Sequence, residues 1–304
     1  KQITNIDEQQ PEIKLTADFE KETRSLQVKV DVTDDTRVAE VKWAEGVQGE
    51  SYFESQGEGI PNNTTVTITK NGYYTFYAED GVGNKQVYTI NVTNVDTEGP
   101  EIEITVEPED GKVTEVKANI EYGDSIKKEY KIGEKGTWKE YTGELTINSY
   151  EMIEQGLANA DKTVTLYARG SDRAGNVTEE NKVIRNIDVD MPKAPVINSN
   201  YGYPILTEYG VQVDGKTEIT YDEREDIENL YSIDNGKTWL KYEGSFIATA
   251  GTIKAKSVKK ESGLEIEVSK AISMPADAIG PAAYDGDEAT YYANPTTGSY
   301  KYIM

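Results

Sequence analysis

Short stretches in which apolar and polar residues alternate recur along most of the chain. Residues 24–34 and 113–124 repeat with a period of two, which is the period of a half-buried strand. Turn-forming residues separate such stretches every eight to twelve positions, roughly the spacing of a β-sandwich. Only residues 149–162 have a helical pattern, long enough for a turn or two. We therefore expect an all-β fold with one short helix.

A polar phrase that ends in proline occurs three times, about every ninety residues. It consists of Asn, a β-branched residue, Asp, three variable residues and Pro, at Asn5–Pro11, Asn94–Pro100 and Asn186–Pro192. Proline has no N–H and holds both itself and the preceding residue in an extended conformation. A connection this short and stiff spaces domains and limits their relative motion. The phrase therefore predicts rigid joints between successive domains.

The segments between these phrases also repeat. Two of them share five residue types at identical spacing: Tyr130, Ile132, Trp138, Tyr141 and Gly143 in one, Tyr231, Ile233, Trp239, Tyr242 and Gly244 in the other. The first repeat keeps a weaker version, with Trp43 where the leading Tyr would be. Such regular self-similarity is the signature of tandem domains.

Each repeat closes with a predicted hairpin. In the first two repeats the turn begins with Asp and ends in Gly83–Asn84 or Gly175–Asn176, which supply the positive φ that a tight turn needs. The third repeat has residues 259–263 in place of this motif. Any function of the turn is therefore not shared by all three repeats.

The repeats predict the following division of the chain. We expect tandem immunoglobulin-like β-sandwiches arranged as an extended rod: residues 1–9 as the tail of a preceding repeat or a linker, modules at 10–96, 97–189 and 190–274, and an incomplete segment at 275–304.

Composition excludes several classes of function. The net charge of −23 argues against nucleic acid and anionic membranes, because both are bound through Lys and Arg. Cys and His are absent, which removes thiol nucleophiles, Ser-His arrangements, thiolate or imidazole zinc sites and disulfides. No apolar run reaches the roughly 18 residues that span a bilayer. We expect neither nucleic-acid binding nor membrane insertion.

The repeated Tyr-x-Ile…Trp…Tyr segment and the Asp…Gly-Asn hairpin resemble the bacterial immunoglobulin-like modules of exported Gram-positive surface and secreted proteins. The resemblance covers Pro11 to about Met274. It implies an extracellular or cell wall-associated location, in keeping with the absence of disulfides, which fits the cytoplasm equally well. It also implies aromatic core positions at Trp138, Trp239, Tyr130, Tyr231, Tyr77 and Tyr167.

After Met274 the pattern changes. The stretch Ala-Tyr-Asp-Gly-Asp-Glu-Ala-Thr-Tyr is similar to the opening of discoidin-type galactose-binding-like domains. In that family the turn holds a structural Ca²⁺, which the resemblance places on Asp285, Asp287 and Thr290. An ordinary turn is the alternative.

Two further sets of residues are candidates for binding. Trp138 and Trp239 suit stacking on sugar rings, but their repeated spacing favours a role in the core or in hairpin packing. The joint acids Asp7, Asp96 and Asp188, with Asp190 and Glu98 nearby, are candidate calcium ligands, since Ca²⁺ takes six to eight oxygens. The alternative is that each Asp caps a turn by accepting hydrogen bonds from nearby N–H groups.

Covalent chemistry is not expected. A glycosidase needs two carboxyl groups about 5–10 Å apart in a cleft, and small sandwiches in series offer no deep cleft. An isopeptide bond needs a Lys buried among apolar groups, whereas Lys29 and Lys117 alternate onto the polar faces of their strands.

We therefore expect a non-enzymatic spacer: a rigid, monomeric stalk, part of a longer bacterial surface or secreted protein, that presents an adjacent functional domain. No cofactor is required, and structural Ca²⁺ is the ligand considered. The alternatives are an adhesin-type module for a glycan or host extracellular-matrix protein, and an accessory region of a glycoside hydrolase. The adhesin-type module would show binding that a pure spacer lacks, and the flanking sequence would identify an accessory region of a glycoside hydrolase.

Overall fold

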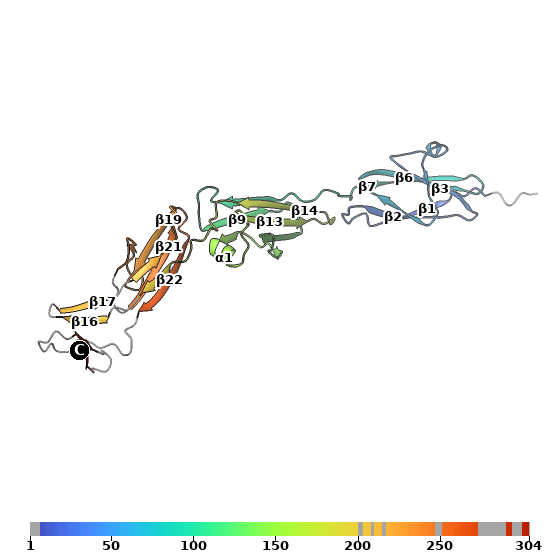
Figure 1. Ribbon diagram of the computed structural model, residues 1–304. Helices are drawn as coiled ribbons and strands as arrows, with labels where there is room; N and C mark the ends of the chain where they lie inside the picture. The colour runs from blue at the N-terminus through green and yellow to red at the C-terminus, as the bar shows by residue number, and fades with distance from the viewer. Residues whose placement is uncertain are drawn as a thin grey trace, which may run out of the picture.

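The alternating stretches form strands that pair into antiparallel sheets, and the sheets lie face to face. The computed structural model describes residues 7–199, 203–207, 210–214, 217–246, 251–272, 290–293 and 300–303. Figure 1 shows three sandwiches following one another along the chain, end to end. This is the tandem immunoglobulin-like all-β architecture that the sequence predicts.

The first sandwich comprises two sheets. One has the order β1-β2-β5 and the other β4-β3-β6-β7. The bounds are β1 Glu12–Thr16, β2 Leu26–Thr33, β3 Val38–Glu45, β4 Glu58–Gly59, β5 Thr64–Ile68, β6 Gly72–Asp80 and β7 Lys85–Val92. A 3₁₀ turn, η1 (Glu50–Tyr52), lies in the β3–β4 loop.

The second sandwich repeats this plan. Its sheets have the orders β12-β9-β8 and β11-β10-β13-β14. The bounds are β8 Glu103–Glu107, β9 Glu115–Glu121, β10 Lys127–Ile132, β11 Lys139–Glu140, β12 Leu145–Asn148, β13 Val164–Ser171 and β14 Val177–Ile184. Helix α1 (Ser149–Glu154) confirms the one predicted helix, and Asn148 caps it by accepting a hydrogen bond from Tyr150 N–H.

The third sandwich has a smaller first sheet. Strands β15 and β18 pair with each other, opposite a sheet of order β20-β19-β21-β22. The bounds are β15 Val196–Ser199, β18 Thr217–Thr220, β19 Ile227–Ser232, β20 Leu240–Lys241, β21 Gly251–Lys259 and β22 Glu265–Ile272.

A further sheet lies beyond the third sandwich. Its order is β17-β16-β23-β24, with β16 Tyr203–Thr207, β17 Gly210–Asp214, β23 Thr290–Ala293 and β24 Tyr300–Ile303. The hairpin β16–β17 leaves the chain between β15 and β18 and pairs with β23 at Leu206 and Tyr291. Residues 275–304 thus contribute two strands to a sheet that begins within the predicted third module.

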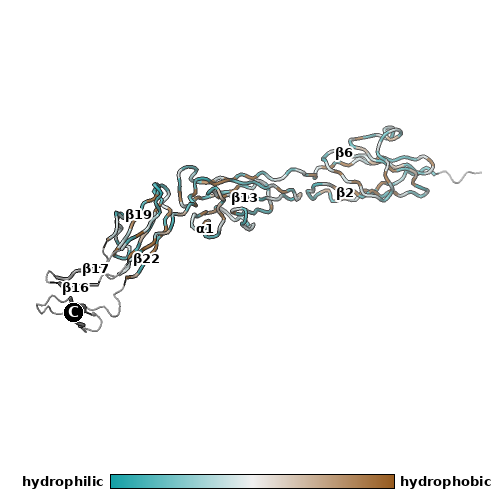
Figure 2. Tube along the Cα trace, in the orientation of Figure 1, coloured by the Kyte–Doolittle hydropathy of each residue, from teal (hydrophilic) through white to brown (hydrophobic). Residues whose placement is uncertain are grey.

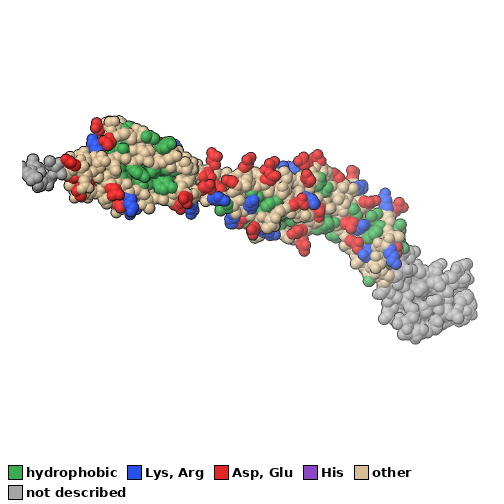
Figure 3. Space-filling model, turned by 180° about the vertical axis from the view of Figure 1, so that it is seen from behind, with side chains coloured by type: hydrophobic (Ala, Val, Ile, Leu, Met, Phe, Trp, Pro, Cys, Tyr) green, Lys and Arg blue, Asp and Glu red, His purple; other side chains and the backbone are tan. Residues whose placement is uncertain are grey.

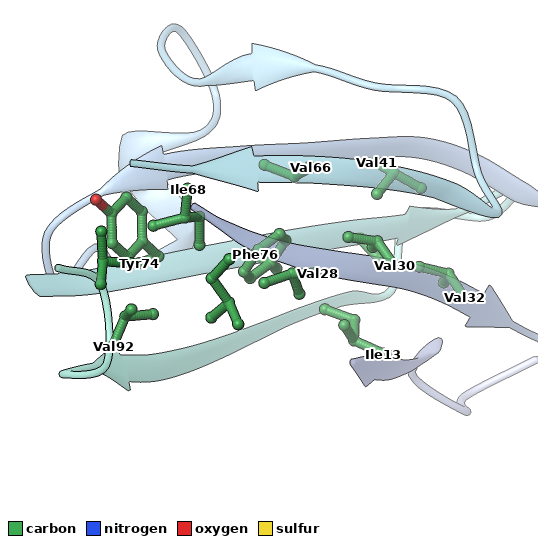
Figure 4. Close-up of a cluster of buried hydrophobic side chains, with 13 residues drawn as sticks. Ile13, Val28, Val30, Val32, Val41, Val66, Ile68, Tyr74, Phe76 and Val92 are labelled. Atoms are coloured by element: carbon green, nitrogen blue, oxygen red, sulfur yellow. The ribbon is translucent and has the colours of Figure 1, made fainter. Parts of the chain in front are cut away.

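Each sandwich has its own apolar core. In the first, alternate residues of β2, among them Val28 and Val30, face Phe76 of β6 across the gap between the sheets (Figure 4). The hydropathy colouring shows brown positions interspersed with teal along the strands of all three sandwiches (Figure 2). Full burial of a Val or Phe side chain contributes about 1.5–3 kcal/mol. The cores are separate, so each sandwich carries its own hydrophobic stabilisation.

Two Tyr clusters reinforce the second and third sandwiches in the same way. The hydroxyl of Tyr141 accepts a hydrogen bond from Ile120 N–H at 3.0 Å, and Tyr242 accepts from Ile219 N–H at 3.0 Å. Each ring also packs against a Tyr at the end of the facing strand, Tyr122 or Tyr221. The repeated Tyr thus links its sheet to the opposite one.

No helix among the described residues is both long and apolar enough to cross a bilayer.

Candidate functional site: the joints between sandwiches

Three joints connect the elements of the rod, and each is the stretch from Asp to Pro in the repeated phrase. We call Asp7–Pro11 the leading joint, Asp96–Pro100 the middle joint and Asp188–Pro192 the last joint. The leading joint enters the first sandwich, and the other two connect successive sandwiches.

The middle joint is held by the sandwich that precedes it. Thr23 N–H donates to the carbonyl of Asn94 at 3.0 Å, and Asp96 N–H donates to the carbonyl of Thr23 at 2.9 Å. This is a parallel bridge between Thr23 and Val95. The side chain of Asn71 adds hydrogen bonds of 2.8 Å to both N–H and C=O of Val95. The main-chain hydrogen bonding of the first sandwich therefore continues into the phrase as far as Asp96, where the middle joint begins.

The last joint is held by the second sandwich with the same hydrogen bonds. Val113 N–H donates to Asn186 C=O at 3.0 Å, and Asp188 N–H donates to Val113 C=O at 2.8 Å. The Asn side chain of the phrase donates to a loop carbonyl in both cases: Asn94 to Asp18 and Lys21, Asn186 to Pro108. This recurrence explains why Asn opens the phrase.

The sandwich that follows grips the middle joint through its closing hairpin. Asn176 Nδ2 donates to the main-chain carbonyl of Asp96 at 3.0 Å and to Asp172 Oδ2 at 2.9 Å. Asp172 Oδ1 accepts from the N–H groups of Gly175 and Asn176 at 2.7 and 2.8 Å. We call Asp172 and Asn176 the middle latch.

The leading joint has the corresponding leading latch, Asp80 and Asn84. Asp80 Oδ1 accepts three N–H groups of the turn, and Asn84 Nδ2 donates to Asp80 Oδ2 at 2.7 Å and to the carbonyl of Asp7 at 3.4 Å. Asp80 and Asp172 are only 1% and 4% exposed. Burial acts to raise the pKa of Asp172, but the hydrogen bonds from Asn176 and Gly175 hold that pKa below its ordinary value. A charged carboxylate is therefore kept at the base of the turn.

Glycine in these turns has the predicted conformation. Gly83 and Gly175 have φ of 100° and 89°, a region that favours Gly. The sequence thus predicted the turn itself correctly. The sequence did not show that the Asn of the turn binds the main-chain carbonyl of the joint Asp. Its only signal for this contact was that the Asp-x-x-x-Asn turn and the joint phrase occur in the same repeats.

The carboxylates of the joint Asp residues cap turns, as the alternative interpretation has it. Oδ1 of Asp7, Asp96 and Asp188 accepts from the N–H two residues on, at 3.0, 3.1 and 3.1 Å. Asp96 lies at a different joint from Asp188 and Asp190, so the structure does not bring these three predicted ligands together. Calcium binding by them stays a prediction.

The last joint replaces the latch by a different set of contacts. Ser262 of the third hairpin donates to Asp188 Oδ2 at 2.7 Å. Glu261 accepts from Lys112 N–H at 3.2 Å, and Glu265 N–H donates to Tyr150 Oη at 3.1 Å, so three hydrogen bonds join the hairpin to residues before it. Leu264 of the same hairpin is 0% exposed.

Charged side chains complete the last joint. Arg224 donates to Asp190 at 2.6 Å and to Asp222 at 2.7 Å, while Lys259 lies 3.3 Å from Asp190. Asp222 also accepts from Lys193 N–H at 2.9 Å. Arg224 holds the pKa of the buried Asp222 carboxyl well below its usual range. Asp190 and Asp222 are thus paired with the chain's own cations, while Asp188 accepts its hydrogen bond from Ser262.

The predicted sugar-stacking residues are occupied by the protein itself. The Trp138 ring lies 4.3 Å from the Arg169 guanidinium and 5.3 Å from the Lys131 ammonium. Lys256 lies 4.6 Å from the Trp239 ring. Each Trp packs the loop that follows β10 or β19 against the outer face of the neighbouring strand. This supports a role in hairpin packing over a role in the core.

The first sandwich uses an apolar pair at the same place. Phe53, at the end of η1, stacks on Tyr77 with ring centroids 5.1 Å apart, and both side chains are buried. The assignment of six aromatic core positions therefore needs correction. Tyr130 and Tyr231 pack on the cores. Tyr77 is buried, but it packs on Phe53 on the face of β6 opposite to Phe76 and the core cluster. Trp138, Trp239 and Tyr167 lie on outer faces, where their rings contact Arg169, Lys256 and Lys131 respectively.

A cluster of three acids lies at the leading joint, with one residue from the joint and two from the turn between β2 and β3. Carboxylate oxygens of Asp7, Asp34 and Asp35 lie within 4.8 Å of one another. No Lys or Arg in the described part of the chain forms an ion pair with them. Asp35 is exposed, yet partial desolvation and the nearby charges of Asp7 and Asp34 raise the pKa of its carboxyl.

Asp285 and Asp287 lie outside the described residues, and Thr290 begins β23. The calcium site expected there stays a prediction.

Similarity to known proteins is found among solved structures. No family model matches the chain, and no curated protein matches it. Among solved structures, a 1.5-MDa bacterial ice-binding adhesin shares 11% identity, with 86% of this chain and 97% of that chain covered and a TM-score of 0.38. A Ca²⁺-stabilised, ice-binding adhesin of an Antarctic bacterium shares 15%, with coverage of 81% and 67% and a TM-score of 0.39.

Protocadherin gamma B2 extracellular cadherin domains 3–6 share 14% identity, with 88% of this chain and 73% of that chain covered and a TM-score of 0.24. Each of these three TM-scores is below 0.5, so the function is inferred from the joints.

Proposed function

We propose that this region is a non-enzymatic stalk of a bacterial surface or secreted protein, which holds a neighbouring functional domain at a fixed distance. The observation that carries the proposal is the double hold on the middle joint. The first sandwich binds the joint through Thr23 and Asn71, and the second sandwich binds it through Asn176.

A joint fixed from both sides has little freedom to bend. Each joint spans only Asp, three residues and Pro, and Gly99 lies so close to Thr178 that a Cβ there would be 2.4 Å from its Oγ1. The linker thus packs on the second sandwich with no slack. Stiffness of this kind suits a spacer.

The acidic surface supports the same function. Red Asp and Glu side chains cover much of the second sandwich in Figure 3, with blue Lys and Arg side chains between them. A net charge of −23 makes neighbouring copies repel one another and keeps an exposed rod dispersed. We propose an extracellular or wall-associated location on this basis.

Stiffness can be measured directly because the chain contains no Cys. Spin labels can be attached at Thr65→Cys in the first sandwich and Glu180→Cys in the second, because both positions are exposed. Pulsed electron–electron double resonance then gives the distribution of distances between the two sandwiches. A stalk gives one narrow distribution. Asn176→Ala should broaden it, whereas Asn181→Ala, on the exposed face of β14, should not.

A broad distribution in the wild-type chain would overturn the stalk. Binding to an array of glycans and matrix proteins is the second measurement, and a stalk binds none of them. Specific binding there would instead support the adhesin-type alternative.

A further inference from the structure

We propose that the leading joint binds a divalent cation, with calcium as the ion its ligands suit, between Asp7 of the joint and Asp34 and Asp35 of the β2–β3 turn. Asp7 is one of the joint acids that the sequence suggests as ligands, whereas Asp34 and Asp35 are brought to it only by the fold. The site is separate from those predicted at Asp96, Asp188, Asp190 and residues 285–290. Three observations support the site: the short distances among the three carboxylates, two buried oxygens that accept no hydrogen bond, and a comparison of the equivalent positions in the three sandwiches.

Two carboxylate oxygens in this cluster are buried without a partner. Asp7 Oδ2 and Asp34 Oδ2 are both excluded from solvent and accept no hydrogen bond. A buried carboxylate oxygen without a donor or cation is strongly destabilising. Asp7 and Asp34 also each contribute one carboxylate oxygen to the group whose members lie within 4.8 Å of one another, so one ion bound between these carboxylates would satisfy both.

The remaining oxygens hold the two carboxylates in orientation. Asp7 Oδ1 accepts from Gln9 N–H at 3.0 Å. Asp34 Oδ1 accepts from Thr36 N–H at 2.9 Å and from Thr36 Oγ1 at 2.6 Å. Hydrogen bonds of this kind, behind the ligand atoms, orient carboxylates toward a metal.

The spacing and chemistry suit calcium. Oxygens on opposite sides of a Ca²⁺ ion are separated by about twice a bond of roughly 2.4 Å, so three oxygens within 4.8 Å of one another can share one ion. Three carboxylates leave room for the carbonyl or water oxygens that complete six to eight ligands. Mg²⁺ has shorter bonds of about 2.0–2.1 Å and demands octahedral geometry.

The last joint shows what replaces the ion elsewhere in the chain. Val32, Tyr122 and Tyr221 occupy equivalent positions at a strand end in the three sandwiches, since Val32 follows Thr23 by nine residues and Tyr122 follows Val113 by nine. The residue three positions further on is Asp35 in the first sandwich, Ser125 in the second and Arg224 in the third. Arg224 binds Asp190 of its joint at 2.6 Å.

The third sandwich therefore supplies a cation where the first supplies an acid. In the second, Ser125 removes the third carboxylate altogether. Only the leading joint, among the described residues, gathers three acids without a counter-charge from the protein. An external cation would tie Asp7 to the first sandwich as Arg224 ties Asp190 to the third.

The test is calorimetric titration of the full 304-residue chain with CaCl₂, with melting curves in CaCl₂, in EDTA and in NaCl of equal ionic strength. Wild type should bind one Ca²⁺ in this site and melt at a higher temperature in CaCl₂ than in either other buffer. Asp35→Ser, which copies the second sandwich, should weaken binding at least about tenfold, since one of three charged ligands is lost.

Asp34→Asn should weaken binding likewise, while Asp124→Asn, the matching acid of the second sandwich, should leave it unchanged. In EDTA, Asp35→Ser should melt above wild type, because repulsion among the acids is relieved. Equal melting in CaCl₂ and NaCl would overturn the site. So would wild-type affinity in both Asp34→Asn and Asp35→Ser. Neither result bears on the stiffness of the middle joint.

Discussion

At the scale of single residues, the most consequential side chain is the Asn that ends the closing turn. Asn176 is 7% exposed, and its amide connects Asp172 of its own turn to the carbonyl of Asp96 in the joint. Asp172 in turn fixes the turn through two N–H groups. The spacing of four residues between Asp and Asn is what allows both contacts at once.

Asn176→Ala should destabilise the second sandwich by about 1–3 kcal/mol, because it leaves buried oxygens of Asp172 and Asp96 without a donor. Urea denaturation followed by fluorescence measures this loss. Asn181→Ala is the control, since that residue is exposed on the same hairpin. Equal losses in the two variants would mean that the latch hydrogen bonds do not contribute.

The two stacked tryptophans give a second prediction. Trp138→Ala should cost about 1–2 kcal/mol, since the ring stacks on Arg169 and a cation–π contact contributes about 0.5–2 kcal/mol. Trp239→Ala should cost less, because a single ammonium faces that ring. Denaturation of each variant gives the comparison. If either change abolished binding to a glycan on an array, the ring would instead be a sugar platform.

At the scale of elements, the alternating pattern predicted strands well because inward and outward faces of a sandwich strand differ sharply in polarity. Strands β2 and β9 follow the pattern residue by residue. Helix α1, of six residues, has the turn or two that its pattern predicts, and Gly156, with a φ of 64°, lies just beyond its end. The 3₁₀ turn η1 was missed because three residues are too few to show a period.

The candidate site was only half predictable. The joint phrase and the Asp…Asn turn are both visible as repeats, but their contact joins residues about eighty positions apart and involves a main-chain carbonyl, which leaves no mark in side-chain type. Asp34 and Asp35 likewise approach Asp7 only through the fold. The hairpin β16–β17 has no counterpart in the first two sandwiches, so comparing the repeats could not predict it.

The repeated Tyr makes an element-scale prediction. Tyr141→Phe should destabilise the second sandwich by about 1 kcal/mol, because it removes the acceptor for Ile120 N–H on β9. Tyr242→Phe should have the same effect on the third sandwich, through Ile219. Hydrogen exchange at these amides reports it directly. Tyr73→Phe, half exposed on β6, is the control, and unchanged protection at Ile120 would contradict the role.

At the scale of the whole molecule, the joints use different chemistry for the same task. The middle joint depends on neutral amide–carbonyl hydrogen bonds, whereas the last joint depends on Arg224 and Lys259 binding Asp190 and Asp222. The bond from Asn176 to the joint carbonyl does not itself titrate, and the ionisable group of the middle latch, Asp172, lies behind that bond and makes no contact with the joint among the hydrogen bonds given above. The two joints should therefore respond differently to acid.

Acidification should loosen the last joint before the middle one. Arg224 lowers the pKa of Asp222 in the folded chain, so the pair stabilises the joint at pH values above about 4, the ordinary pKa of an unfolded Asp. This stabilisation is lost as pH falls from there toward the folded pKa. Asp190 behaves in the same direction: burial alone would raise its pKa, but Lys259 and Arg224 lower it.

Spin labels at Glu180→Cys and Ser269→Cys report the last joint, and Thr65→Cys with Glu180→Cys reports the middle one. Between pH 7 and pH 3 the first pair should broaden and the second should change less. Asp222→Asn should weaken the last joint by about 1.5–3 kcal/mol already at pH 7, since a charge-assisted hydrogen bond is lost, and should reduce its further response to acid. If both pairs broadened together, acid would be unfolding the sandwiches and not releasing a joint.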